Sequence, residues 1–278
     1  MEAIYNYISK NMTTVKKEDL IFPYLDYGFL YGYGLFESIR VLDGKAILLQ
    51  DHINRIRKCS IELEIPFFYS DEDIKRKVDE LISINNVVTG VLNFYLTPGD
   101  RGIDPAKVVD NDPFFLILMR QYPKYSSEDK LSLDVRPLAF QRTPLDRYKT
   151  LSWMKNVLEN KLSTFDDILL YDDNEMLLET TRSNMFFIKD DVLITPKSTV
   201  ILPGITRGFL IKSAAKLSFK IEEREVYVGE LLGFDEVFLT NSLRSIILVD
   251  SINNIPNLKS KEKTIQIQKS YFELANNS

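Results

Sequence analysis

The sequence predicts an α+β protein of two domains. With 278 residues, of which 45% are hydrophobic, the chain can bury two cores. The spacing of apolar residues changes repeatedly between a helical and a strand period, and hairpin-like segments outnumber βαβ units. The polar stretch QYPKYSSEDK marks the domain boundary. We therefore expect an N-terminal domain over residues 1–122, a linker over 123–130 and a C-terminal domain over 131–278.

The N-terminal half combines two helices with hairpin strands. The stretch 50–63 places one apolar face on a helix, and Ser70 with Asp73 resembles a capping box before a second helix. Asp43-Gly44 lies between two β-rich flanks and predicts a two-residue hairpin turn. The runs VLNFYL and FFLILM are typical of buried strands.

The C-terminal half begins with a strand in LSLDVRPLAF, a turn at Pro144 and a helix from about Ser152 to Leu162. Two hairpins are expected to turn at Asp173-Asn174 and Asp190-Asp191. TRGFLIKSAAKL predicts a helix, and EREVYV, DEVFLTN and SIILVD predict strands.

Composition excludes several classes of protein. The net charge of -5 and the scattered Lys and Arg residues leave no basic surface for nucleic acid. Cys59 and His52 are the single cysteine and histidine, so neither an internal disulfide nor a His/Cys metal cluster is expected. The sequence has no signal-peptide pattern and no apolar run near the ~18 residues of a membrane span. We expect a cytoplasmic protein without a membrane or nucleic-acid partner.

Two polar clusters are candidate binding sites. In ILPGITRGF, Pro203 stiffens the entry, Gly204 allows a ligand to approach the backbone, and Thr206 is expected to cap a helix whose N–H groups bind an anion. An ordinary capped helix after a Pro-Gly turn is the more common explanation of this pattern. In ETTRSNMFF, Glu179 is followed by five polar residues, a pattern that a solvated turn between strands also explains.

Two further segments have both a structural and a functional interpretation. His52 and Arg55 share one helix, where histidine is most often a packing residue and arginine a surface charge. In DYGFLYGYGLFESIR, Tyr31 and Phe36 belong to a glycine-rich aromatic stretch that fits either the wall of a pocket or a core at a strand entry. The stretch does not match a nucleotide-binding glycine motif.

Together these segments resemble the class IV aminotransferases, the fold type IV pyridoxal phosphate enzymes, over nearly the whole chain. The family pattern is met by Glu179, by Asn184-Met185-Phe186, by Leu193-Ile194-Thr195 and by the run from Leu202 to Arg207. The aromatic-glycine stretch, the pair His52 and Arg55, and EVFLTNSLRSI fit as well. The resemblance implies a smaller N-terminal α/β domain, a larger C-terminal domain with a mixed, barrel-like sheet, a cofactor between the domains and a homodimer.

The resemblance also implies the cofactor, pyridoxal 5'-phosphate, and the role of each residue. The Schiff-base lysine corresponds to Lys149, the catalytic residue, and the carboxylate at the pyridine nitrogen corresponds to Glu179. The other implied cofactor-binding residues are Arg55, Ser183, Asn184, Ile205, Thr206 and Ser242. The candidate substrate-binding residues are Tyr31, Phe36, Arg101, Trp153 and Leu243.

Lys149 needs an unusual environment for this role. An ordinary lysine with a pKa near ~10.4 is almost fully protonated at neutral pH, so a nucleophilic amine requires desolvation or a neighbouring cation. Released during the reaction, the amine is then the natural base for the proton on the substrate Cα. Glu179 would favour a protonated pyridine nitrogen, which makes the ring an electron sink.

The sequence leaves the substrate open between an amino acid with a 2-oxo acid acceptor and aminodeoxychorismate. A D-amino-acid transaminase would be expected to carry an arginine where Pro98 stands, and a branched-chain transaminase one near Asn93. Arg101, Arg40 or Arg182 could replace these carboxylate-binding residues. FLTNSLRSI and RVLDGKAILLQDHINRI resemble the aminodeoxychorismate lyases most. We favour an aminotransferase, with the lyase as the alternative and a cofactor-free scaffold as a third reading.

Overall fold

The structure, a computed structural model, describes residues 3–100, 102, 112–123, 125–126, 128–253, 255–256 and 261–275. The chain forms two compact units. The first comprises Met1–Lys124 with the short stretch Tyr148–Ser152, and the second comprises Tyr125–Arg147 with Trp153–Ser278. The stretch that carries Lys149 therefore clusters with the first unit, although it lies within the range 131–278 that we assigned to the C-terminal domain.

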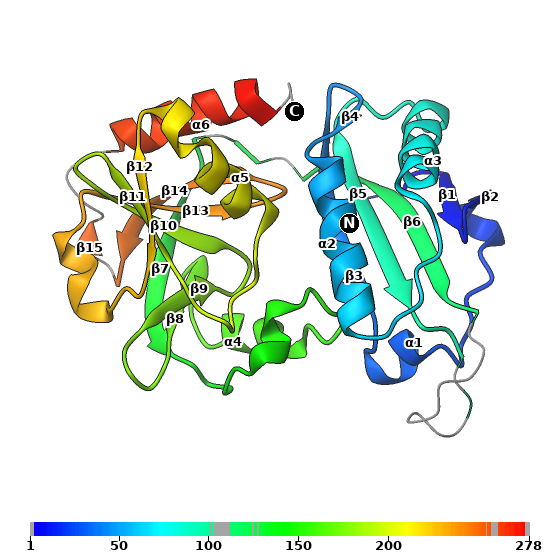
Figure 1. The fold of residues 1–278 in the computed structure, drawn as a ribbon, viewed down its shortest axis with the longest axis horizontal. Helices are drawn as coiled ribbons and strands as arrows, with labels where there is room; N and C mark the ends of the chain where they lie inside the picture. Colours follow the sequence, from blue (N-terminus) through cyan, green and yellow to red (C-terminus); the bar gives the residue numbers. More distant parts are fainter. Residues whose placement is uncertain are drawn as a thin grey trace. The chain divides into compact units, whose positions relative to one another are not determined.

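The first unit is built on an antiparallel sheet in the order β2-β1-β6-β5-β3-β4 (Figure 1). Its strands are β1 (Tyr7–Lys10), β2 (Thr13–Lys16), β3 (Leu35–Leu42), β4 (Lys45–Ala46), β5 (Gly90–Thr97) and β6 (Phe114–Gln121). Its helices are the 3-10 helix η1 (Lys17–Asp19), α1 (Tyr27–Tyr31), α2 (Leu49–Glu62) and α3 (Asp71–Ile84). The predicted hairpin turn at Asp43-Gly44 is confirmed, and both of its residues have the positive φ that such a turn requires.

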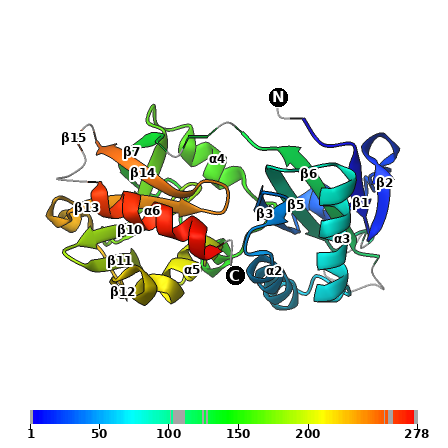
Figure 2. The same cartoon turned by 90° about the horizontal axis from the view of Figure 1, so that it is seen from above.

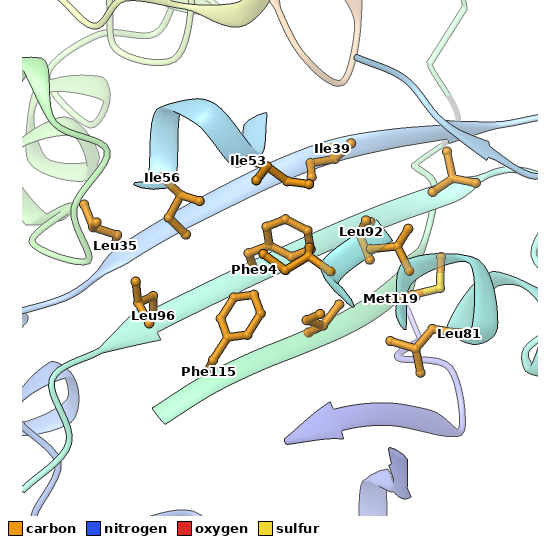
Figure 3. Close-up of a cluster of buried hydrophobic side chains, with 14 of the residues drawn as sticks. Leu35, Ile39, Ile53, Ile56, Leu81, Leu92, Phe94, Leu96, Phe115 and Met119 are labelled. Atoms are coloured by element: carbon orange, nitrogen blue, oxygen red, sulfur yellow. The ribbon is translucent and has the colours of Figure 1, made fainter. Parts of the chain in front are cut away.

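Helices α2 and α3 cover one face of this sheet (Figure 2). Ile53 and Ile56 of α2 meet Ile39 of β3 and Phe94 of β5 in a fully buried apolar cluster (Figure 3). The capping predicted before α3 is confirmed, because Ser70 Oγ accepts a hydrogen bond of 3.1 Å from the backbone N–H of Asp73. The apolar helical face predicted for residues 50–63 is what holds α2 on the sheet.

Strand β3 alternates between two faces. Leu35, Ile39 and Val41 point into the helix-covered core, whereas Phe36 and Arg40 belong to the opposite face and are only partly buried. Residues 148–152 pair with the start of β3, where the N–H of Phe36 donates to Lys149 O at 2.9 Å. A Cβ at Gly34 would lie 2.8 Å from the backbone O of Leu96 in β5 and 2.7 Å from the tip of the Leu151 side chain, so this position favours glycine.

The second unit contains a nine-stranded mixed sheet with the order β12-β11-β10-β13-β14-β7-β8-β9, in which β15 pairs with β14. The neighbours β11–β12, β14–β7 and β7–β8 are parallel and the other pairs are antiparallel. Strand β9, at one end of this path, also contacts β10 and β11, so the sheet curls back on itself. This agrees with the mixed, barrel-like sheet that we expected.

The strands of this sheet are β7 (Lys130–Pro137), β8 (Asp167–Tyr171), β9 (Leu177–Thr180), β10 (Asn184–Lys189), β11 (Val192–Pro196), β12 (Lys220–Arg224), β13 (Glu236–Asn241), β14 (Ser245–Ile252) and β15 (Ile255–Pro256). The helices of the unit are α4 (Met154–Asn160), α5 (Ile205–Ser213) and α6 (Glu262–Ala275), with 3-10 helices η2 (Pro144–Arg147), η3 (Ala214–Leu217) and η4 (Val228–Gly233). Helix α6 lies across β13 and β14 (Figure 2).

Some element predictions differ from the structure. The strand predicted in EREVYV is instead β12, because Lys220–Arg224 pairs in parallel with Val192–Pro196. Helix α4 is shorter than the predicted range of Ser152 to Leu162. Sequence reasoning missed β1, β2, α1 and α6. Within the described part of the chain, we find no helix with the length and apolar character needed to cross a membrane.

Candidate active site

Lys149 lies against an aromatic surface in the first unit. Its Nζ is 4.3 Å from the centroid of the Phe36 ring, and the side chain is partly buried. Phe36 in turn stacks on Tyr95, with 6.4 Å between the ring centroids and 16° between the planes. The backbone pairing of Lys149 with Phe36 fixes where the amine emerges. An amine held beside ring faces is partly desolvated, which is the environment that a nucleophilic lysine needs.

Arg55 and His52 hold one buried carboxylate, that of Glu37, on the helix-covered side of β3. Arg55 donates from Nε to Glu37 Oε1 at 2.7 Å and from Nη2 to Oε2 at 2.5 Å. His52 Nδ1 lies 2.6 Å from the same Oε2. Glu37 is 1% exposed and His52 is 1% exposed. Such a bidentate, charge-assisted pair fixes the direction of the guanidinium.

The electrostatics of this group favour a charged glutamate and a neutral histidine. Burial alone would raise the pKa of Glu37, but the charges and hydrogen bonds of Arg55 and His52 outweigh burial and lower the pKa to about 2. Burial lowers the pKa of His52, and although Glu37 opposes this, the charges of Arg55 and Lys149 lower it further. His52 is therefore uncharged at neutral pH.

Glu179 is the centre of a polar group in the second unit. Arg142 Nη1 donates to Glu179 Oε1, and both side chains are 9% exposed. Asn184 Nδ2 donates to Glu179 Oε2 and to Leu202 O, each at 2.9 Å. The N–H of Leu202 also faces the carboxylate at 3.3 Å. These donors keep the Glu179 carboxylate in one orientation.

Helix α5 begins beside this group. Gly204 precedes its first residue, Ile205, and no side chain caps the helix, so the expectation that Thr206 caps it was wrong. Thr206 instead lies inside the first turn, where its hydroxyl is buried without a hydrogen-bond partner in the described chain. The first N–H groups of a helix also lack partners within it. An orphaned hydroxyl beside such N–H groups is what an anion such as a phosphate would satisfy.

Two more of the expected residues, Ser183 and Ser242, lie in two turns of the same unit that Asn241 connects. Ser183 Oγ accepts a hydrogen bond of 3.0 Å from Asn241 Nδ2. Asn241 Oδ1 accepts from the N–H of Leu243 at 3.1 Å, which gives a tight turn in which Ser242 is partly buried. This turn joins β13 to β14.

The remaining expected substrate residues lie in separate segments of the chain. Tyr31 ends α1, is 63% exposed and packs its ring edge-on against Tyr27 at 4.9 Å. Trp153 immediately precedes α4 and is partly buried. Arg101 lies outside the described residues. Arg182 donates to Asp166 O at 2.7 Å on the surface of the second unit.

Sequence reasoning missed Glu37 and Arg142. Glu37 had one signal, because it is an acid among the inward-facing apolar positions of a strand, and a buried acid needs a partner. Arg142 had none, since its distance from Glu179 along the chain hides the pairing. Both belong to the polar groups that orient the expected cofactor residues.

Comparisons with known proteins identify the family of the chain. The sequence model of the family described as Amino-transferase class IV matches residues 34–252. The chain therefore belongs to the class IV aminotransferase family, and it is an enzyme.

Its relatives have different activities. A D-alanine aminotransferase of Bacillus licheniformis is 29% identical over 242 residues, which cover 82% of each chain. An aminodeoxychorismate lyase of Bacillus subtilis is 28% identical over 253 residues, covering 87% of this chain and 85% of that protein. The crystal structure of the Escherichia coli branched-chain amino acid aminotransferase has the same fold, with a TM-score of 0.88 at 23% identity, over 98% of this chain and 95% of that one.

Replacing Glu37 with Gln should destabilise the first unit by about 3–5 kcal/mol, because Arg55 is left as a buried, unpaired charge. Glu37 has a lowered pKa in the folded state, so its contribution is present above the ordinary pKa of 4.5 and is lost as the pH falls toward about 2. Urea unfolding of the wild type and of Glu37→Gln should show a difference in the free energy of unfolding that is constant near neutral pH and shrinks below pH 4.5.

Glu62→Gln is the matched control. Glu62 lies on the surface of α2, the helix that carries Arg55, in a loose ion pair of 3.8 Å with Lys58. We expect Glu62→Gln to change the free energy of unfolding by no more than about 0.5 kcal/mol, and this change should vary little with pH. Equal effects of the two substitutions would show that the Glu37 pair is not a strong constraint.

Gly204→Ala should destabilise the second unit by about 1–3 kcal/mol, because the new Cβ would overlap Asn184 Oδ1 and displace the amide that holds Glu179. Gly208→Ala, one turn later in α5, meets no atom within 4 Å and should be neutral or stabilise by about 0.5–1 kcal/mol. Thermal unfolding measures both. If the two variants are equally stable, the packing of Asn184 against Gly204 does not constrain the site.

Proposed function

We propose that the chain is a pyridoxal 5'-phosphate-dependent aminotransferase that transfers an amino group from an amino acid to a 2-oxo acid. Membership of the class IV family supports this reaction. The observation that supports the role of Lys149 best is its amine, held by backbone pairing against the Phe36 ring.

The proposal assigns each cofactor contact to a residue with matching chemistry. Arg55 and the start of α5, with Ile205 N and Thr206 N and Oγ1, would bind the phosphate, and the orphaned Thr206 hydroxyl supports this assignment. Glu179 would accept a hydrogen bond from the protonated ring nitrogen. Arg142 and Asn184 would keep its carboxylate in place for that contact. Ser183 and Ser242 are the further proposed contacts.

The bound cofactor supplies an aldehyde that captures amines and a ring that withdraws electrons from the substrate Cα. In our proposal Lys149 Nζ holds the cofactor between turnovers and moves a proton from the substrate Cα when it is free. The neutral His52 and the charged Glu37 orient Arg55 without adding net positive charge. Phe36 and Tyr95 exclude water from one side of the amine.

The alternative is an aminodeoxychorismate lyase, which would use the same residues to release pyruvate and p-aminobenzoate. The named lyase of Bacillus subtilis, at 28% identity over 87% of the chain, favours it almost as strongly as the aminotransferase relatives favour transamination. No residue described above discriminates the two reactions, since both begin at the same amine.

We also propose a cytoplasmic homodimer. A run of large apolar side chains from Ile21 to Tyr31 supports a protein partner, because isolated monomers rarely expose such a patch. Its exposed members are Ile21, Phe22, Tyr24, Leu25, Phe29, Leu30 and Tyr31. If light scattering gives the molar mass of a single chain over a wide range of concentrations, the dimer is rejected.

Lys149→Ala should abolish the visible absorbance of the bound cofactor and its covalent trapping by borohydride, because no other amine is expected to replace Nζ. Glu179→Ala should retain trapping yet lose about 100-fold or more in turnover, since the ring nitrogen loses its carboxylate. Lys155→Ala is the control, because Lys155 lies on the surface of α4 in an ion pair of 3.5 Å with Asp146. Trapping that survives Lys149→Ala would reject the assignment, and a wild type that binds no cofactor would indicate a scaffold.

A substrate panel separates the two enzyme candidates. The panel contains both enantiomers of acidic, branched and short amino acids, and each is tested for conversion of the bound cofactor to its amine form. Aminodeoxychorismate is tested without any oxo acid. Conversion by an amino acid at a rate that supports turnover would confirm the aminotransferase. Pyruvate and p-aminobenzoate formed in the absence of an acceptor would favour the lyase instead.

A further inference from the structure

Two arginines lie at one level on the sheet face that carries Phe36. Arg40 of β3 is the cross-strand partner of Val91 of β5, and Val91 is the partner of Arg120 of β6. Residues directly opposite one another on antiparallel strands point to the same face. Arg40 and Arg120 therefore flank Val91 on one face, about 10 Å apart at their Cα atoms.

The two guanidinium groups are held by aromatic residues. Arg120 Nη2 donates to Tyr95 Oη at 2.9 Å, and its Nε is buried without a hydrogen-bond partner among the described residues. The Arg40 guanidinium lies 4.9 Å from the centroid of the Tyr122 ring. A buried guanidinium N–H that lacks an acceptor is costly unless a ligand supplies one.

The same face leads from these arginines to Lys149. Phe36 and Tyr95 are cross-strand partners on it, and Lys149 Nζ lies over the Phe36 ring. Phe36 and Arg40 are four residues apart on β3, which corresponds to about 13 Å. Because Arg120 reaches back to the hydroxyl of Tyr95, its charge approaches the aromatic pair more closely than this spacing suggests. The face thus carries an amine at one end, aromatic rings in the middle and two cations at the other end.

We propose that Arg40 and Arg120 bind the carboxylate remote from the reacting carbon of a dicarboxylic substrate, an inference that rests on the proposed function of Lys149. A substrate whose reacting carbon lies at the amine would extend its chain along Phe36 and Tyr95. Its far carboxylate would then accept charge-assisted hydrogen bonds from the guanidinium groups.

The competing explanation is that the arginines only support the sheet, with Arg120 holding Tyr95. A structural role would affect acids of every charge equally, whereas a carboxylate site discriminates between a dicarboxylate and a monocarboxylate of the same length. The test therefore compares glutarate with pentanoate, neither of which has an amine or an oxo group to react at Lys149.

Isothermal titration calorimetry of the cofactor-loaded protein measures both acids against wild type, Arg40→Met and Arg120→Met. We expect each substitution to weaken glutarate about ten- to hundredfold and pentanoate by less than about twofold, because one charge-assisted contact is lost. Arg120→Lys keeps the charge and should lose less than Arg120→Met. Arg76→Met is the control, because Arg76 is 75% exposed on α3 and should change neither affinity.

Equal losses for the two acids, or no loss for glutarate, would overturn the proposal, and so would wild-type protein that does not bind glutarate at millimolar concentration. Unfolding midpoints of the variants identify any that fail to fold, in which case Arg120→Lys carries the comparison.

Kinetics separate this inference from the proposed function. The second-order rate of cofactor conversion by glutamate, relative to glutamine, should fall in the Met variants about as much as glutarate affinity does. If no amino acid converts the cofactor while glutarate binding still depends on the arginines, the aminotransferase fails and the carboxylate site stands. If conversion is normal and the ratio is unchanged, the carboxylate site alone fails. Turnover of aminodeoxychorismate, which is also a dicarboxylate, distinguishes that source of the same chemistry.

Discussion

The arrangement of the first unit depends on the backbone pairing of residues 148–152 with the start of β3. Lys149 and Phe36 are far apart in the sequence, yet the hydrogen bond from Phe36 N to Lys149 O makes them neighbours. Gly34 lies in this pairing, and a Cβ there would lie 2.8 Å from the backbone O of Leu96 in the adjacent strand. Because the backbone is fixed on both sides, the amine has few positions available, and the Phe36 ring occupies one side of them.

Buried charge is the second constraint, and each unit handles it by pairing. Glu37 neutralises Arg55 on the covered side of β3, and Arg142 neutralises Glu179 in the second unit. A buried ion pair contributes little net stability, because desolvation offsets most of the attraction. Its effect is directional, because each pair holds a side chain of the proposed site in one orientation. The pairing with Glu37 is what allows Arg55 to be buried, so the alternative interpretation of Arg55 as a surface charge does not apply.

The two faces of β3 divide these tasks. The inward positions build the core with α2 and include Glu37, whereas the outward positions present Phe36 and Arg40. A shift of one residue in the register of β3 would exchange the faces and place the aromatic and cationic groups in the core. The apolar packing of Ile53 and Ile56 against the sheet therefore preserves the chemistry of the opposite face as well as the fold.

The local elements were largely readable from the sequence. The apolar period fixed α2 and α3, Asp43-Gly44 fixed a hairpin, and short apolar runs fixed β5 and β6, because these depend on neighbours in the chain. Helix α6 was missed because its start is held by Glu236, which accepts from Thr264 N at 2.8 Å and lies far upstream. Thr206 was misjudged because a capping role depends on where the helix begins.

The sequence by itself determined the family and which residue types carry the expected chemistry, since motifs such as the run from Leu202 to Arg207 are local. Tertiary structure alone decided which side chains meet. It paired Glu37 with Arg55 and Arg142 with Glu179, and it brought Arg40 and Arg120 to one level across β5. These contacts depend on strand register and burial, and neither quantity is set by the spacing of residues along one segment.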